Sequence, residues 1–378
     1  MKVYFPNLNG LRFIAASSVV VSHVEMVKMV FGQDNQWKTH TVQLLGHLGV
    51  ILFFALSGFL ITYLLLIEKK VTQNISIKDF YIRRILRIWP LYFFLIIGGL
   101  FLLPHVHFLD IPHAPQVPNQ SWWSMALLYL VILPNVAVKL FPAVPFIGHT
   151  WSIGVEEQFY YLWPWLVKLS KKIIWALVGV IGFYLCILFL ATYFQSQHPG
   201  NYFWNIFNKV WLTSSIDCMA IGGIFSWIYF HRKKRILQIL YHPIVHLGVL
   251  FSTIALILLG IRFPLLHQEI YAVLFSIIIL NFSTNPKPIF SLENRLINYL
   301  GKVSYGIYMY HVLCIVICYK LIFYFLGQPH NLLLYISSYL LTFLVSALSY
   351  EWMEKYFIHL KSKFSKVISG DLAKDKTH

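Results

Sequence analysis

The chain has 378 residues, of which 58% are hydrophobic, 17% aromatic and only 12% charged. This composition excludes an ordinary soluble domain and predicts an integral membrane protein, because apolar stretches of about 20 residues recur along the chain. The formal net charge of +16 comes mostly from Lys and Arg between those stretches, so retention at the cytoplasmic membrane surface explains it and we expect no nucleic-acid binding.

The apolar segments that could cross a bilayer lie at 11–30, 45–67, 88–103, 121–138, 152–169, 173–194, 211–230, 245–261, 265–282, 303–326 and 332–352. Arg12 and His23 interrupt the first segment and no cleavage site follows it, so we expect a retained first span rather than a signal peptide. Basic clusters lie near 68–70, 83–87, 168–172 and 232–235 and in the C-terminal tail. Placing these clusters and both termini in the cytoplasm requires an even number of crossings.

Eleven segments cannot meet that requirement, and the conflict falls on 121–169, which Pro134, Pro142 and Pro145 interrupt. One segment there is predicted to be re-entrant or half-crossing, because broken backbone is tolerated at membrane depth where it lines a cavity. The sequence therefore predicts an all-α polytopic membrane protein with about ten transmembrane helices enclosing a polar cavity. We expect one membrane domain over 1–354 and a basic cytoplasmic tail over 355–378.

Cysteine and histidine patterns give no metal site. All four cysteines fall inside apolar segments and are read as small core residues, with neither a disulfide nor a metal: Cys186, Cys218, Cys314 and Cys318. His105, His107 and His113 share a loop with Asp110 as the only acidic partner, which favours a proline-stiffened outer loop over a metal site.

The first predicted span carries two ionisable side chains. Arg12 and His23 are eleven residues apart, which on a helix puts them on nearly the same face and about 16 Å apart along the axis. Polar groups are costly inside a bilayer, so both are functional candidates. His23 could accept a proton from a hydroxyl near neutral pH, and the alternative is a histidine that only packs against a neighbouring helix.

Three arginines precede the third predicted span. Arg83, Arg84 and Arg87 lie within five residues, and on a helix both Arg83 and Arg84 share a face with Arg87. Guanidinium groups bind phosphate oxygens with two hydrogen bonds, so this cluster could hold a phosphorylated cofactor. The alternative is a topology anchor at the lipid headgroups.

Further polar residues interrupt later apolar segments. Ser57 and Gly58 are small residues that favour close helix packing, or a wall beside an acyl chain. Glu156 and Glu157 point about 100° apart on a helix, so we expect one of them to face the cavity. Candidates for the substrate site or cavity wall are Ser57, Trp151, Ser152, Glu157, Tyr160, Asp217, Tyr305, Tyr308 and His311.

Together these stretches resemble the membrane-bound acyltransferase 3 family, whose members include O-acetyltransferases of bacterial surface polysaccharides. Arg12 and His23 match the family's Arg-x10-His pattern, and Arg84 with Arg87 matches its Arg-x-x-Arg motif. The blocks at 57–59, 151–160 and 304–311 follow in the expected order.

The resemblance implies that His23 is catalytic, that Arg12 is essential and that the arginine motif binds acyl-coenzyme A entering from the cytoplasm. We add Glu156 to the catalytic candidates. Some relatives carry an extracytoplasmic hydrolase-like domain after the last span. Because this sequence ends shortly after its last predicted span, we expect no such domain, and we expect the membrane unit to complete transfer alone or with a partner.

We therefore expect an enzyme of a bacterial cytoplasmic membrane that transfers an acyl group, acetyl being the family's common choice, from acyl-coenzyme A to a hydroxyl of a cell-envelope carbohydrate or glycolipid. A direct transfer and an acyl-enzyme intermediate both stay open, as do the acceptor and the oligomeric state. The alternatives are a transporter or flippase of a glycan or lipid-linked sugar, and a non-catalytic scaffold.

Overall fold

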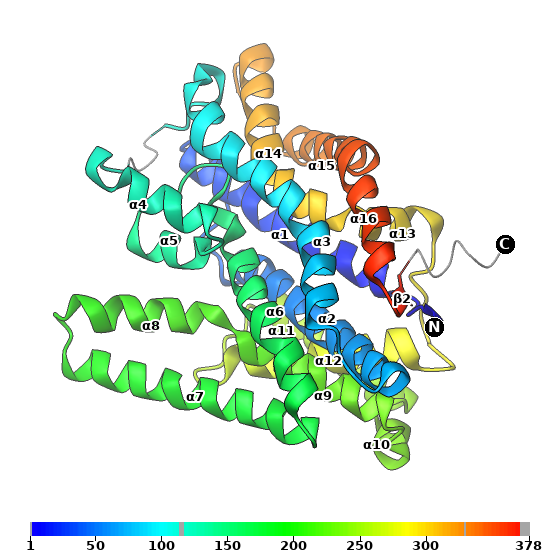
Figure 1. Ribbon diagram of the computed structural model, residues 1–378. Coiled ribbons are helices and arrows are strands. Elements are labelled where there is room, and N and C mark those ends of the chain that lie inside the picture. The colour runs from blue at the N-terminus through cyan, green and yellow to red at the C-terminus, as the bar shows by residue number, and fades with distance from the viewer. Residues whose placement is uncertain (1, 113–116, 329, 371–378) are drawn as a thin grey trace.

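The computed structural model describes residues 2–112, 117–328 and 330–370, and these residues are almost entirely helical. The all-α polytopic prediction is confirmed, with one small addition. Strands β1 (Lys2–Val3) and β2 (Ile368–Ser369) pair in parallel and join the two ends of the described chain. Figure 1 shows β2 and α16 beside the N-terminal segment, on what we call the terminal face of the molecule.

The first half of the chain forms the helices α1 (Leu8–Val30), α2 (His40–Thr72), α3 (Ile77–Ile97), α4 (Asn119–Leu130), α5 (Pro134–Leu140), α6 (Trp151–Leu169), α7 (Ile173–Gln197) and α8 (Tyr202–Ser214). The second half forms α9 (Ile216–Phe230), α10 (Lys234–Leu240), α11 (Pro243–Leu258), α12 (His267–Thr284), α13 (Arg295–Lys302), α14 (Ser304–Leu326), α15 (Asn331–Ser349) and α16 (Lys355–Lys361). Short π- or 3-10-helical turns lie at Gly98–Leu102, Leu103–His105, His107–Leu109, Gly148–Thr150, Tyr350–Glu354 and Ser362–Phe364.

Among the described residues, 7 helical segments are long and apolar enough to cross a membrane, and α10 with α11, bent by 57°, would make 8. This is fewer than the ten or so spans expected from hydropathy. Helix α6 contains Glu156, Glu157 and Lys168, and α12 begins and ends with polar residues, so both fall short of an uninterrupted apolar span.

The region 121–169 is broken, as its prolines predicted. It contains α4, α5, a 3-10 turn and α6. At 1.5 Å per residue the 12 residues of α4 and the 7 of α5 are too short to cross a hydrocarbon core of about 30 Å. Residue His113 of the preceding loop lies outside the described residues.

Helix α2 forms the centre of the fold. It packs along α1 on one side and α9 on another, and most of its apolar side chains are buried. A Cβ atom on Gly58 would lie 1.9 Å from the carbonyl oxygen of Met219, and one on Gly222 would lie 2.2 Å from that of Ala55. These two glycines therefore let α2 and α9 cross in backbone contact, which is the packing role expected for Gly58.

Candidate active site

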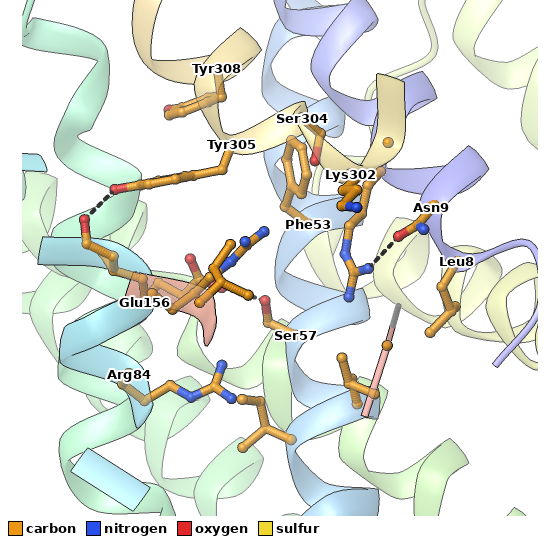
Figure 2. A pocket seen from close by; sticks show the side chains of 18 of the residues that line it. Leu8, Asn9, Phe53, Ser57, Arg84, Glu156, Lys302, Ser304, Tyr305 and Tyr308 are labelled. Carbon is orange, nitrogen blue, oxygen red and sulfur yellow. Dashed lines mark hydrogen bonds between the residues drawn. The ribbon is translucent and has the colours of Figure 1, made fainter. Parts of the chain in front are cut away.

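One cavity of about 280 Å³ opens among α1, α2, α3, α6, α13, α14 and α16. Its lining is strongly basic, with Glu156 as its only carboxylate among the described residues. The lysines and arginines that line it are Arg12, Arg84, Arg87, Lys302, Lys355 and Lys361. In Figure 2, Glu156 and Ser57 lie between Arg84 on one side and the rings of Tyr305 and Tyr308 on the other.

Helix α3 carries Arg84 and Arg87 into this cavity. The helix begins after Ser76, whose side chain accepts a hydrogen bond from the Asp79 N–H at 3.4 Å. The Arg84 guanidinium lies 5.3 Å from the ring centroid of Tyr160, and its Nε has no hydrogen-bond partner among the described residues. Arg84 is therefore held by aromatic contact and leaves a hydrogen-bond donor for a ligand.

Arg83 has a different environment from its two neighbours. It does not line the cavity. Its guanidinium forms an ion pair with Glu68 at 2.9 Å and donates to the Phe364 carbonyl oxygen at 2.8 Å. The three arginines that the sequence grouped as one cofactor site are thus divided, two toward the cavity and one toward the C-terminal segment.

Glu156 and Glu157 diverge from α6. Ser57 and Tyr160 both donate hydrogen bonds to Glu156, so the carboxylate at the cavity wall is held by neutral hydroxyls. Glu157 does not line the cavity and instead accepts from the indole N–H of Trp89 at 3.1 Å.

The end of the cavity away from the terminal face is closed by a layer of hydroxyl groups. The Tyr308 hydroxyl donates to the His149 carbonyl oxygen at 2.6 Å and lies 2.7 Å from the Ser152 hydroxyl. Tyr305 donates to the Ile88 carbonyl oxygen at 2.9 Å. These bonds join α14 to α3, to α6 and to the turn before α6, and the Tyr305 and Tyr308 side chains line this end of the cavity.

Behind this layer lies a cluster of three imidazoles, His23, His149 and His311. His311 is fully buried, and its Nε2 lies 2.9 Å from the Nδ1 of His23. The His149 ring centroid is 4.8 Å from that of His311 and 6.3 Å from that of His23. The buried ring nitrogens of His149 form no hydrogen bond of normal geometry with the described residues, and the backbone of Met309 and Tyr308 is their polar neighbour.

The hydrogen bonds fix the tautomers of two of these rings. His311 Nδ1 lies 2.6 Å from the Tyr308 carbonyl oxygen, which can only accept, so this nitrogen carries the proton. In neutral His311 the Nε2 must then accept, and His23 Nδ1 must donate to it. The Nε2 of neutral His23 then carries the lone pair, which is the form required of a base.

The other predicted residues separate into two groups. Arg12 lines the cavity and donates to the Asn9 side chain at 3.0 Å, while Ser57, Ser152, Tyr160, Tyr305 and Tyr308 also line it. His23 does not line it, and neither do Trp151, which packs against the core, or Asp217, which is buried in α9.

Sequence reasoning missed the cavity residues Lys302, His359 and Lys361, and it gave His149 no role. A lysine-rich tail predicts only a cytoplasmic location, and nothing in the sequence places it beside Arg84. Within the described residues, no group of three or more His, Cys, Asp or Glu side chains could hold a metal ion.

The chain is similar in sequence to known acyltransferases. The acyltransferase 3 family, described as an acyltransferase domain, matches residues 5–351. The chain is 28% identical over 382 residues to the O-acetyltransferase OatA of Staphylococcus aureus strain NCTC 8325, covering 93% of this chain and 57% of that protein. OatA of strain COL gives the same figures.

This chain therefore spans little more than half the length of the curated relatives it matches. No solved structure matches it. The family match nonetheless extends from the N-terminal segment to the end of α15, and so includes both the histidine cluster and most of the cavity wall. The chain belongs to the acyltransferase 3 family.

Proposed function

We propose that this protein transfers an acyl group, most simply acetyl, from acyl-coenzyme A to a hydroxyl of a cell-envelope carbohydrate or glycolipid. One observation carries the proposal: a cavity lined by cations ends on a hydroxyl layer, and behind that layer the contact of His23 Nδ1 with His311 leaves the His23 lone pair on Nε2. The cations suit the phosphates of the donor, and the imidazole suits the proton of the acceptor.

The donor would enter from the terminal face. Arg84 and Arg87 would bind its phosphates, and its acyl arm would extend past Glu156 toward Tyr308 and Ser152. The cytoplasm would then lie on the terminal face, which the retention of Lys and Arg on the inner side of bacterial membranes supports.

In the transfer step, His23 Nε2 takes the proton of the acceptor hydroxyl while its oxygen attacks the thioester carbonyl carbon. The new C–O bond forms, the C–S bond breaks, and the proton on His23 passes to the leaving thiolate. His311 keeps the imidazole oriented throughout, because its Nε2 continues to accept from His23 Nδ1. His149, whose buried ring packs against those of His311 and Tyr308, would hydrogen-bond the acceptor.

The test is transfer of labelled acetyl from acetyl-coenzyme A to an envelope glycan fraction, with purified protein in proteoliposomes. General-base catalysis contributes roughly 10²- to 10⁴-fold, so His23→Ala is expected to lose at least about 100-fold in rate. His198→Ala, at the exposed end of α7, is the matched control and should equal the wild type.

Substantial transfer by folded His23→Ala protein would exclude His23 as the base. A wild-type protein that binds no coenzyme A, yet moves glycan across the bilayer without an acyl donor, would favour the transporter. Label that stays on the protein when the acceptor is omitted would replace direct attack with an acyl-enzyme intermediate.

A further inference from the structure

The segment that follows α15 forms part of the cavity wall. The chain continues from the π-helical turn Tyr350–Glu354 through α16 and the 3-10 turn Ser362–Phe364 to β2. Helix α16 packs against α3, the helix that carries the arginine motif. Lys355, His359 and Lys361 of α16 line the cavity beside Arg84 and Arg87.

Two contacts fix this segment in place. Arg83 links it to α2 and α3, because its guanidinium bridges the Glu68 carboxylate and the Phe364 carbonyl oxygen. The pairing of β2 with β1 then ties the end of the segment to the residues just before α1. Both contacts follow Lys361 in the chain, and α16, which ends at Lys361, packs against α3, so the segment is held against the body of the protein.

Lys361 differs from Lys355, the other lysine of α16 that lines the cavity, in its charged neighbours. Lys355 pairs with Glu351 at 2.6 Å, whereas Lys361 has no ion pair among the described residues. The charged groups that act most strongly on it are Arg84, Arg87, Arg83 and Arg12, all of the same sign. Glu354 lies near Arg87, but it is buried outside the cavity lining and forms no ion pair there.

Several like charges held close together in a partly enclosed space repel one another, and this cost is offset when a polyanion binds between them. Phosphate groups are the natural partners of such a lysine and arginine cluster. Coenzyme A supplies a diphosphate and a 3′-phosphate, and an anionic lipid headgroup is the other source of the same chemistry.

We propose that the segment 355–370 is a structural part of the donor site and that Lys361 binds a phosphate of acyl-coenzyme A together with Arg84 and Arg87. Arg83 acts as a positioning residue, because it holds the segment without reaching the cavity. This inference rests on the proposed function and adds a binding residue beyond the arginine motif.

The experiment compares Lys361→Ala and Lys361→Gln with Lys363→Ala in nanodiscs of zwitterionic phosphatidylcholine. Lys363 is exposed, lies two residues from Lys361 and does not line the cavity. Its replacement by Ala therefore removes the same charge and leaves the cavity lining unchanged. Both Lys361 variants lose a charge-assisted hydrogen bond to phosphate. The binding free energy lost should raise the Kd and the KM for acetyl-coenzyme A about 10- to 100-fold. Their kcat should stay within about twofold of wild type, and Lys363→Ala should change neither constant.

The outcomes separate the two proposals. Wild-type protein that binds no acetyl-coenzyme A overturns the proposed function itself. Wild-type protein that binds it, with folded Lys361 variants of equal affinity, overturns only the role of Lys361. A Lys361 effect that is seen only when phosphatidylglycerol is added to the nanodiscs would assign the lysine to a lipid headgroup and also overturn the inference.

Discussion

At the scale of single residues, the interaction between His23 and His311 determines which nitrogen could act in catalysis. A lone imidazole distributes its proton between two nitrogens, whereas here the Tyr308 carbonyl oxygen and His311 together place the His23 proton on Nδ1. The spacing of Arg12 and His23 predicted two polar groups on one helix face, but it could not predict the partner. His311 is 288 residues away in sequence, and only the packing of α14 against α1 brings the rings together.

Replacing His311 should therefore lower the rate without weakening donor binding. In His311→Ala, His23 loses the acceptor that fixes its tautomer, and we expect kcat to fall about 10- to 100-fold with the KM for acetyl-coenzyme A unchanged. His311→Gln offers an amide oxygen to the same Nδ1–H and should recover part of that loss. Steady-state kinetics of both variants in proteoliposomes check this. A rise in KM with no change in kcat would instead give His311 a role in binding.

At the scale of helices, the close crossing of α2 and α9 sets the shape of the cavity wall, because Ser57 lies beside Gly58 on α2. Gly58→Ala should destabilise the protein, since its Cβ would overlap the Met219 carbonyl oxygen and force the helices apart. Overpacking of this kind costs about 1–3 kcal/mol. Gly179→Ala in α7 meets open space and should be neutral or stabilising. Thermal unfolding in detergent compares the two, and equal midpoints would refute the packing argument.

The helices also show which features of the fold the sequence could predict. Hydropathy located the long spans, and the prolines of 121–169 predicted the broken region, because both signals are local. The division of Arg83 from Arg84 and Arg87 was beyond it. All three lie on a single helix, and their different roles depend on Glu68 of the preceding helix α2 and on the carbonyl oxygen of Phe364, which is 281 residues away in sequence. Lys361 could not be predicted either, because it is distant in sequence from Arg84 and Arg87 and only the packing of α16 on α3 brings them together.

At the scale of the whole molecule, the basic residues of the cavity and both ends of the described chain lie on the same face. The parallel pairing of β1 with β2 puts both ends of the described chain on the terminal face, where α16 and Lys302 border the cavity. A donor made in the cytoplasm can reach this cavity only if that face is cytoplasmic. The proposed function and the topology are therefore linked, and a measurement of one constrains the other.

Labelling of single cysteines tests this orientation. We take a background with Cys186, the exposed native cysteine, changed to Ser, because Cys218, Cys314 and Cys318 are buried. In intact spheroplasts a membrane-impermeant maleimide should label His105→Cys, in the exposed loop after α3, and should label Lys363→Cys only after the membrane is permeabilised. The reverse pattern would put the cationic cavity outside the cell. Cytoplasmic acyl-coenzyme A could then not reach Arg84 and Arg87, and the proposed direction of transfer would be wrong.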